Sequence, residues 1–168
     1  MSRQNKQFSV RFWLFFIFMA LNALFWMGFI NARGNDSQQT QEQHTCACTL
    51  NCMDRRVQRP VEEGTKKECR VDGVDVITQA GMVKVLAENE KKFLIDNFRE
   101  EIELSVKEHG TKKVTIVAHH DCVGNPVSKE KQIEHLRQAK KTVESFNLGV
   151  EIILLWVDAP FKKAEVIK

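Results

Sequence analysis

The sequence predicts an α/β domain with a small, mostly parallel four-stranded sheet flanked by helices, preceded by one N-terminal transmembrane or signal-anchor helix. Three observations predict it: a long uncharged apolar run near the N-terminus, alternating strand-like and helix-like segments from residue 44 onward, and metal-binding side chains directly after two strand-like segments. Alternating strands and helices are typical of parallel sheets. We expect a membrane segment over residues 1–33, a polar tether over 34–43 and a folded domain over 44–168.

The predicted anchor is the run from Phe12 to Ile30, which contains no charged residue. At ~1.5 Å per helical residue, this run is about long enough to cross a hydrocarbon core of ~30 Å. Trp13 and Trp26 lie near its two ends, where interfacial aromatic residues are favoured. The basic residues before the run predict a cytoplasmic N-terminus, and therefore a single-pass protein whose folded domain lies outside the cytoplasm. The alternative is export after signal cleavage, although Ile30 makes residues 30–32 a poor cleavage site.

The formal net charge of +3 comes from the N-terminal segment. Four of the 25 basic residues and none of the 22 acidic residues lie within residues 1–33, which leaves 21 basic against 22 acidic residues in the remainder. The sequence has no stripe of lysine and arginine interleaved with aromatic residues, the usual footprint of a nucleic-acid-binding surface. We therefore expect no nucleic-acid partner.

The first half of the folded domain is predicted to contain two strands and one long helix. His44–Asn51 is short and rich in threonine and cysteine, and we interpret it as the first strand. The charged segment 55–72, which contains a proline and a glycine, is interpreted as an exposed loop or an irregular helix. Val74–Thr78 is the second strand. Apolar residues at close to helical spacing predict one helix over Met82–His109, ended by Gly110.

The second half is predicted to contain two buried strands separated by a helix. Lys113–Ala118 is a continuous apolar run, typical of a strand that is buried on both faces. Ser128 is the predicted N-cap of a helix that continues to about Phe146. Val150–Val157 is the final buried strand, which completes the expected four.

Metal-binding side chains follow two of the predicted strands. Cys52 comes directly after the first strand, and His119 and Cys122 come directly after Lys113–Ala118. Because the carboxyl ends of parallel strands meet at the same edge of a sheet, we expect these three side chains to converge. Two thiolates and one imidazole are zinc ligands, and three protein ligands leave a fourth position open, as in catalytic zinc sites. Zinc in such a site lowers the pKa of a bound water to ~7.

The pattern C-x-D-x-R after one strand and H-x-x-C after a later one resembles the β-class carbonic anhydrases, in particular their short, divergent members. The resemblance extends over nearly all of residues 44–158, and residues 79–81 are similar to the family's R-N-A-G segment. It implies zinc-dependent reversible hydration of carbon dioxide to bicarbonate. It also implies a Zn²⁺ cofactor held by Cys52, His119 and Cys122, and a homodimer.

The resemblance further implies that Asp54 and Arg56 are the family's catalytic pair beside the metal. A bidentate ion pair lets Arg56 hold the Asp54 carboxylate, which then orients the attacking oxygen toward carbon dioxide. If Arg56 releases it, Asp54 is expected to occupy the fourth metal position itself. The chain departs from the family pattern at Arg55, which is usually serine, and at Ala118 and Val123, which are usually glycine.

These departures leave two alternatives to carbon dioxide hydration. One is hydrolysis of carbonyl sulfide or carbon disulfide, since the family that the chain resembles includes such activities. The other is a catalytically silent zinc-binding module associated with a membrane. The apolar lining around the metal bears on the first alternative, and the direction of the Arg55 side chain bears on the second.

Three cysteines lie outside the implied ligand set. In an oxidising compartment, Cys46 or Cys48 is expected to bridge to Cys69. Asp121 is interpreted as a hydrogen-bond acceptor beside the ligands or as a loop cap, and His135 is expected to face solvent.

Overall fold

A computed structural model describes residues 45–168 of the chain. The predicted anchor and tether lie outside the described residues, and so does the first residue of the first predicted strand. Within residues 45–168, every helix is too short or too polar to cross a membrane.

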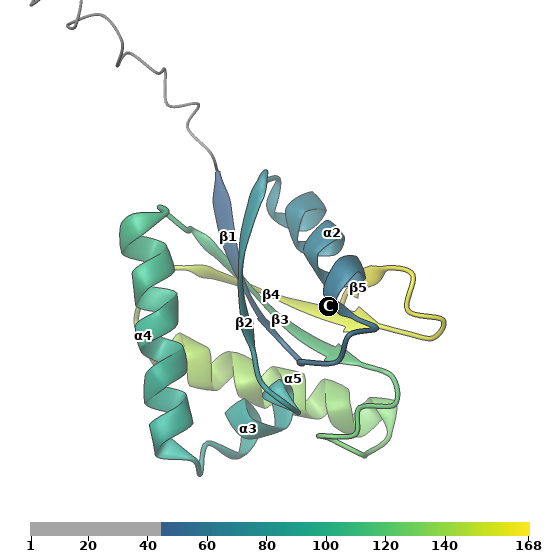
Figure 1. Ribbon diagram of the computed structural model, residues 1–168. Coiled ribbons are helices and arrows are strands. Elements are labelled where there is room, and N and C mark those ends of the chain that lie inside the picture. Colours follow the sequence, from purple (N-terminus) through teal and green to yellow (C-terminus); the bar gives the residue numbers. More distant parts are fainter. Residues whose placement is uncertain (1–44) are drawn as a thin grey trace, which may run out of the picture. The chain divides into compact units, whose positions relative to one another are not determined.

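A five-stranded mixed sheet forms the centre of the domain (Figure 1). Its strand order is β2-β1-β3-β4-β5; the first four strands are parallel, and β5 is antiparallel to β4. The elements in chain order are β1 (Cys46–Asn51), α2 (Gln58–Cys69), β2 (Gly73–Thr78), α3 (Met82–Glu88), α4 (Lys92–Glu108), β3 (Lys113–His119), α5 (Lys129–Glu144), β4 (Glu151–Val157) and β5 (Ala164–Val166).

The prediction of an α/β sheet flanked by helices is confirmed, and the prediction of four strands is wrong. The fifth strand has only three residues, and its backbone pairs with residues 155–157 of β4. So short a segment carries no measurable two-residue alternation. Its strand conformation depends on the chain turning back after β4, which is a long-range property.

Helices cover both faces of the sheet. Alternate residues of β3 point to opposite faces, as the two-residue period of a strand requires. Ile116 packs with α3, α4 and α5, whereas Val117 packs with Val61 of α2. Central parallel strands therefore bury both faces, which is why β3 and β4 read as continuous apolar runs.

Two predicted segments differ from the observed helices. The segment 55–72, expected to be an exposed loop or an irregular helix, contains the regular helix α2; Pro60 lies in its first turn, where the missing N–H is not needed. Gly64 lies inside α2 because a Cβ there would come within 2.7 Å of Ala164 on β5. The expected single helix over Met82–His109 is two helices, since Asn89 takes a left-handed conformation (φ 52°) that ends α3.

The cysteine and histidine expectations also need correction. All five cysteines are free thiols. Cys48 packs in the core on the α4 face of the sheet, and Cys69 lies on α2, which covers the opposite face, so the expected bridge to Cys69 is wrong. His135 lies on the inner side of α5 and is buried rather than solvent-facing.

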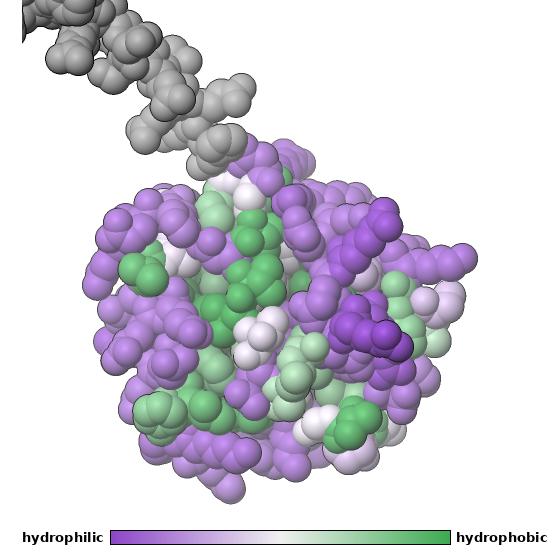
Figure 2. Space-filling view, viewed as in Figure 1, coloured by the Kyte–Doolittle hydropathy of each residue, from purple (hydrophilic) through white to green (hydrophobic). Residues whose placement is uncertain are grey.

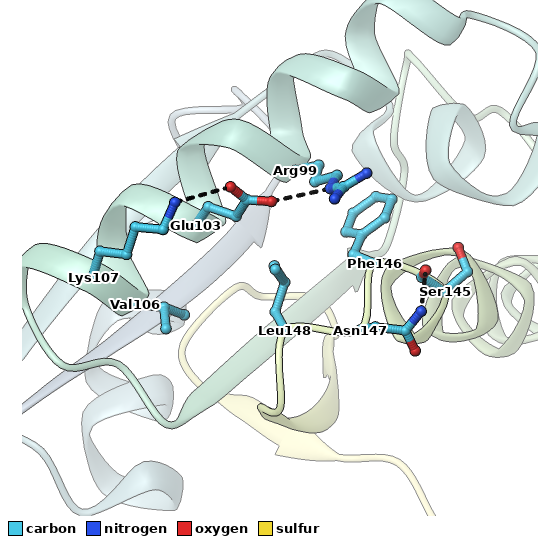
Figure 3. Close-up of a pocket in the computed structure, with 8 residues that line it drawn as sticks. All are labelled: Arg99, Glu103, Val106, Lys107, Ser145, Phe146, Asn147 and Leu148. Atoms are coloured by element: carbon cyan, nitrogen blue, oxygen red, sulfur yellow. Dashed lines mark hydrogen bonds and ion pairs between the residues drawn. The ribbon is translucent and has the colours of Figure 1, made fainter.

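Among residues 45–168, the surface includes the edge strand β2 and a pocket beside α4. Figure 2 shows apolar surface in the middle of the view, and the exposed Val76 belongs to the edge strand β2. The pocket, of about 580 Å³, lies between α4 and the segment after α5 (Figure 3). Its Glu103 already accepts hydrogen bonds from Arg99 and Lys107, so the charged side chains in the pocket pair with one another. This pocket contains no cysteine or histidine, so it is not the predicted metal site.

Candidate metal centre

The three predicted ligands converge at one edge of the sheet. Cys52 follows the last residue of β1, His119 is the last residue of β3, and Cys122 lies in the turn after β3. Strands β1 and β3 are parallel neighbours, so their carboxyl ends lie side by side. One donor atom from each residue lies within 4.8 Å of the other two. The residues are 6%, 1% and 4% exposed, respectively. We call these three residues the Cys₂His cluster.

The cluster has the geometry and the donor set of a zinc site. The Cys52 and Cys122 Sγ atoms are 3.8 Å apart, too far for a disulfide. Two sulfurs held about 2.3 Å from one ion at a tetrahedral angle are separated by about 3.8 Å. The spacing of the two thiols therefore suits a single tetrahedral ion.

The His119 ring presents an unused nitrogen to this site. Its Nδ1 lies 2.8 Å from the His120 carbonyl oxygen, which can only accept a hydrogen bond, so Nδ1 carries the proton. Its Nε2 is then a lone-pair acceptor, and it is buried without a hydrogen-bond partner among the described residues. A buried acceptor without a partner is costly, and a metal ion would satisfy it.

Electrostatics at the two sulfurs favour a cation. The hydrogen bond between the two thiols lowers the pKa of Cys52 despite its burial, and backbone N–H groups of Gly81 and Asp54 contribute to the lowering. The same hydrogen bond and burial raise the pKa of Cys122. Burial acts to lower the pKa of His119, but contact with Cys52 outweighs it and the pKa is raised. One thiolate shared by the pair therefore supplies negative charge where a metal would bind.

Asp54 and Arg56 form the predicted pair at the rim of the cluster. The Arg56 Nε atom lies 3.1 Å and 3.0 Å from the two Asp54 carboxylate oxygens, and Nη2 lies 2.6 Å from Oδ2. Hydrogen bonds from Arg56 hold the pKa of Asp54 at about 2, well below its ordinary value of 3.8. Asp54 is held by Arg56 and is not one of the residues in the Cys₂His cluster.

Arg56 has two further partners after the ends of neighbouring strands. Its Nη1 lies 3.1 Å from the Asp121 Oδ2, and Nη2 donates to the Asp121 carbonyl oxygen at 2.9 Å. Its guanidinium carbon lies 4.5 Å from the centre of the Phe161 ring, a cation–π distance. Asp121 was expected as an acceptor near the ligands, and it contacts Arg56. Phe161 was missed: its position after β4 places it at this edge, but an aromatic side chain gives no chemical signal in the sequence.

Two glycines bring the loops of the site together. Gly81 has a φ of 63°, and a Cβ at that position would overlap the backbone of Gly124 in the turn after Cys122. The segments that begin α3 and follow β3 therefore meet backbone to backbone. That close approach also carries the Gly81 N–H toward Cys52 and the Gly124 N–H toward Cys122.

Replacing Gly81 with alanine is expected to damage the site more than the same change at Gly110. Both residues have φ near +65°, so both variants carry about 1–2 kcal/mol of left-handed strain. Only Gly81 also faces a backbone clash, which adds about 1–3 kcal/mol. Urea unfolding and zinc content measure the difference. Equal stability losses in the two variants, with zinc retained in both, would contradict this packing.

The fold and the Cys₂His cluster together define an α/β domain with a buried group of side chains that could hold a metal ion. A family model described as "Putative carbonic anhydrase" matches residues 42–167, and the chain belongs to this family.

Two solved structures are similar to this chain. The β-carbonic anhydrase isoform I of the protozoan Trichomonas vaginalis is 15% identical, over 89% of this chain and 96% of its own, with a TM-score of 0.50. A carbonic anhydrase from Glaciozyma antarctica is 16% identical, over 84% of this chain and 93% of its own, with a TM-score of 0.47. No curated protein matches the sequence. The family match confirms the predicted resemblance to carbonic anhydrases, and the Trichomonas vaginalis enzyme shares the fold.

Proposed function

We propose that the chain is a zinc enzyme that reversibly hydrates carbon dioxide to bicarbonate. The observation that carries the proposal is the buried Cys₂His cluster, whose 3.8 Å separation between sulfurs suits one tetrahedral ion. Family membership supports a carbonic anhydrase type of chemistry. Cys52, His119 and Cys122 would hold the zinc ion. When bound, zinc lowers the pKa of a water to ~7 and so supplies the nucleophile at neutral pH.

Asp54 and Arg56 orient the reaction in this proposal. The ionised Asp54 carboxylate accepts a hydrogen bond from the attacking water and aims its lone pair at the carbon of carbon dioxide. Arg56 keeps this carboxylate charged and in place through its two-pronged contact. As the new carbon–oxygen bond forms, one carbon–oxygen double bond opens and the water gives up a proton to solvent. The products are bicarbonate and H⁺.

The surroundings of the cluster are mainly apolar and closely packed. Val83, Val117 and Ala118 lie beside the ligands, together with the polar Asn125 and Gln132. Apolar neighbours suit carbon dioxide and would equally suit carbonyl sulfide or carbon disulfide, so both sulfur substrates belong in the test. Arg55 is exposed and Val123 is 86% exposed, and neither is among these neighbours. The side chains at these two departures therefore do not obstruct the cluster, which argues against the catalytically silent alternative.

The proposal also places catalysis outside the cytoplasm. The uncharged run from Phe12 to Ile30, preceded by basic residues, supports a single-pass anchor with a cytoplasmic N-terminus. Export after signal cleavage would place the domain in the same compartment without the membrane anchor. A homodimer remains part of the proposal because a folded domain of this size has only a modest core.

The test uses the full chain, purified in a mild detergent without chelator. Plasma mass spectrometry measures zinc per chain, and stopped-flow measurement with a pH indicator follows carbon dioxide hydration. We expect hydration that disappears when a chelator removes the zinc and returns when zinc is added back. Zinc without carbon dioxide hydration, but with release of hydrogen sulfide from carbonyl sulfide or carbon disulfide, would move the assignment to the sulfur substrates. A folded chain that binds no zinc would contradict the proposal.

A further inference from the structure

A second group of metal-binding side chains lies at the opposite end of the sheet. Cys46 is the first residue of β1, Asp75 is the third residue of β2, and His109 caps the C-terminus of α4. We propose that Cys46, Asp75 and His109 form a second divalent-metal site, which takes zinc or a similar first-row ion. We call these residues the Cys46 cluster. Cys52 is six positions after Cys46, or about 20 Å along an extended strand, so the two clusters are distinct sites.

The donor atoms of the Cys46 cluster are already close together. One donor atom from each of its three residues lies within 4.8 Å of the other two. The His109 Nδ1 atom is 2.7 Å from the Asp75 Oδ2 atom. A tetrahedral ion with ligand bonds of about 2.0–2.3 Å separates its donor atoms by about 3.3–3.8 Å. Shifts of about 1 Å in these side chains would therefore complete the coordination.

The fold fixes the positions of these residues. Cys46 and Asp75 lie on neighbouring parallel strands, in register with Gly73 and Cys48, respectively. Gly73 lies beside Cys46, and a Cβ at Gly73 would make an ordinary van der Waals contact with the Cys46 sulfur at 3.8 Å. His109 is held by the last turn of a 17-residue helix, where its backbone N–H donates to the Ser105 carbonyl oxygen. Two strands and one helix end thus bring the three side chains together.

The chemistry of the Cys46 cluster selects a class of ion. Thiolate, imidazole and carboxylate together suit zinc and similar first-row ions, whereas calcium and magnesium require oxygen ligands. The carbonyl end of α4 adds partial negative charge that favours a cation. Cys46 and Asp75 are half-buried, and the His109 side chain is 55% exposed, so the remaining coordination positions face solvent.

A plain ion pair between Asp75 and His109 is the competing interpretation. It accounts for the 2.7 Å contact and leaves Cys46 as a thiol that hydrogen-bonds to the Ala47 carbonyl oxygen and to Asp75. The two interpretations therefore differ in what happens when Cys46 or His109 is replaced. An ion pair predicts a change in stability only, whereas a metal site predicts the loss of one bound ion.

The experiment counts zinc in the full chain after loading with zinc and removal of the free ion. We expect two equivalents in the wild type and one in Cys46→Ser and in His109→Ala. His109 is exposed, so its replacement leaves the core intact, and thermal unfolding verifies the fold. Glu108→Gln, which changes the exposed neighbour on the same helix, is the matched control and should keep two equivalents. Cobalt in place of zinc should give a thiolate-to-metal absorption band in Cys52→Ser/Cys122→Ser that disappears when Cys46→Ser is added.

Three results would overturn the second site. One is a His109→Ala or Cys46→Ser variant that binds as much zinc as the wild type. Another is a folded Cys52→Ser/Cys122→Ser double variant that binds no zinc at all. The third is a cobalt spectrum that does not respond to Cys46→Ser. None of these measurements depends on hydration activity, so the second site stands or falls separately from the proposed function.

Discussion

Cys122→Ser is expected to abolish carbon dioxide hydration and to empty the Cys₂His cluster of zinc. The serine hydroxyl does not ionise at neutral pH, and zinc ligands of this kind bind as thiolates. The loss also leaves Cys52 without the hydrogen-bond partner that lowers its pKa, so the second sulfur becomes a weaker ligand. Hydration should fall to the uncatalysed rate, and zinc content should fall by one equivalent. Stopped-flow rates and plasma mass spectrometry on the same preparation measure both.

Cys69→Ser is the matched control for this variant. Cys69 is also a buried free cysteine, but it lies at the end of α2 and outside both clusters. Burying a hydroxyl in its place costs about 1–3 kcal/mol of stability, with no change in zinc content. If Cys122→Ser keeps its zinc, or if Cys69→Ser loses as much as Cys122→Ser does, the ligand assignment is wrong.

Asp54→Asn is expected to lower carbon dioxide hydration by about 100-fold or more while zinc stays bound. Asparagine keeps the shape of aspartate but loses the negative charge that accepts the hydrogen bond of the attacking water and pairs with Arg56. Asp54 is outside the Cys₂His cluster, so the ligand set is unchanged. The readout is the ratio of hydration rate to bound zinc, which separates a catalytic defect from loss of metal.

Asp121→Asn is the comparison for Asp54→Asn, because Asp121 contacts the same guanidinium. The side chain of Asp121 is 68% exposed, and its backbone carbonyl contact with Arg56 survives the change. We expect its hydration rate to fall by less than about tenfold, since surface ion pairs contribute little. If both variants lose a similar share of the hydration rate, the effect comes from the position of Arg56. If Asp54→Asn hydrates carbon dioxide nearly as fast as the wild type, Asp54 has no part in the mechanism.

The pH dependence of the Asp54 pair follows from its lowered pKa. The folded pKa is about 2, below the ordinary value of 3.8. The stabilisation from the ionised pair is therefore fully present above about pH 4, and it is lost as the pH falls toward about 2. Between about pH 5 and 9, wild type and Asp54→Asn should show hydration profiles of the same shape and different height. An acid limb that is present in the wild type and missing in Asp54→Asn would contradict the assigned pKa.

Two features could be predicted from the sequence alone. They are the apolar runs of β3 and β4 and the residue types at the ends of the strands. Strands buried on both faces must be continuously apolar, and donor residues directly after them must lie at one edge of a parallel sheet. These two local signals are sufficient to predict the α/β class and the Cys52, His119 and Cys122 set. They did not decide whether the segment 55–72 is a loop or a helix. Its proline fits α2 because it lies in the first turn, and its glycine fits because Ala164 packs against it. The two local signals also missed the break at Asn89, whose left-handed conformation ends α3.

By itself, the sequence determined which side chains are available and at which end of each strand they stand. Only the tertiary structure decided which of them meet. Four features join residues that are far apart in the chain. They are the 3.8 Å spacing of the two sulfurs, the contact of Phe161 with Arg56, the pairing of β5 with β4, and the approach of His109 to Cys46 and Asp75. A residue pattern specifies local conformation and the face that a side chain occupies. Distances between elements depend instead on how the whole sheet and its helices pack, which no local pattern contains.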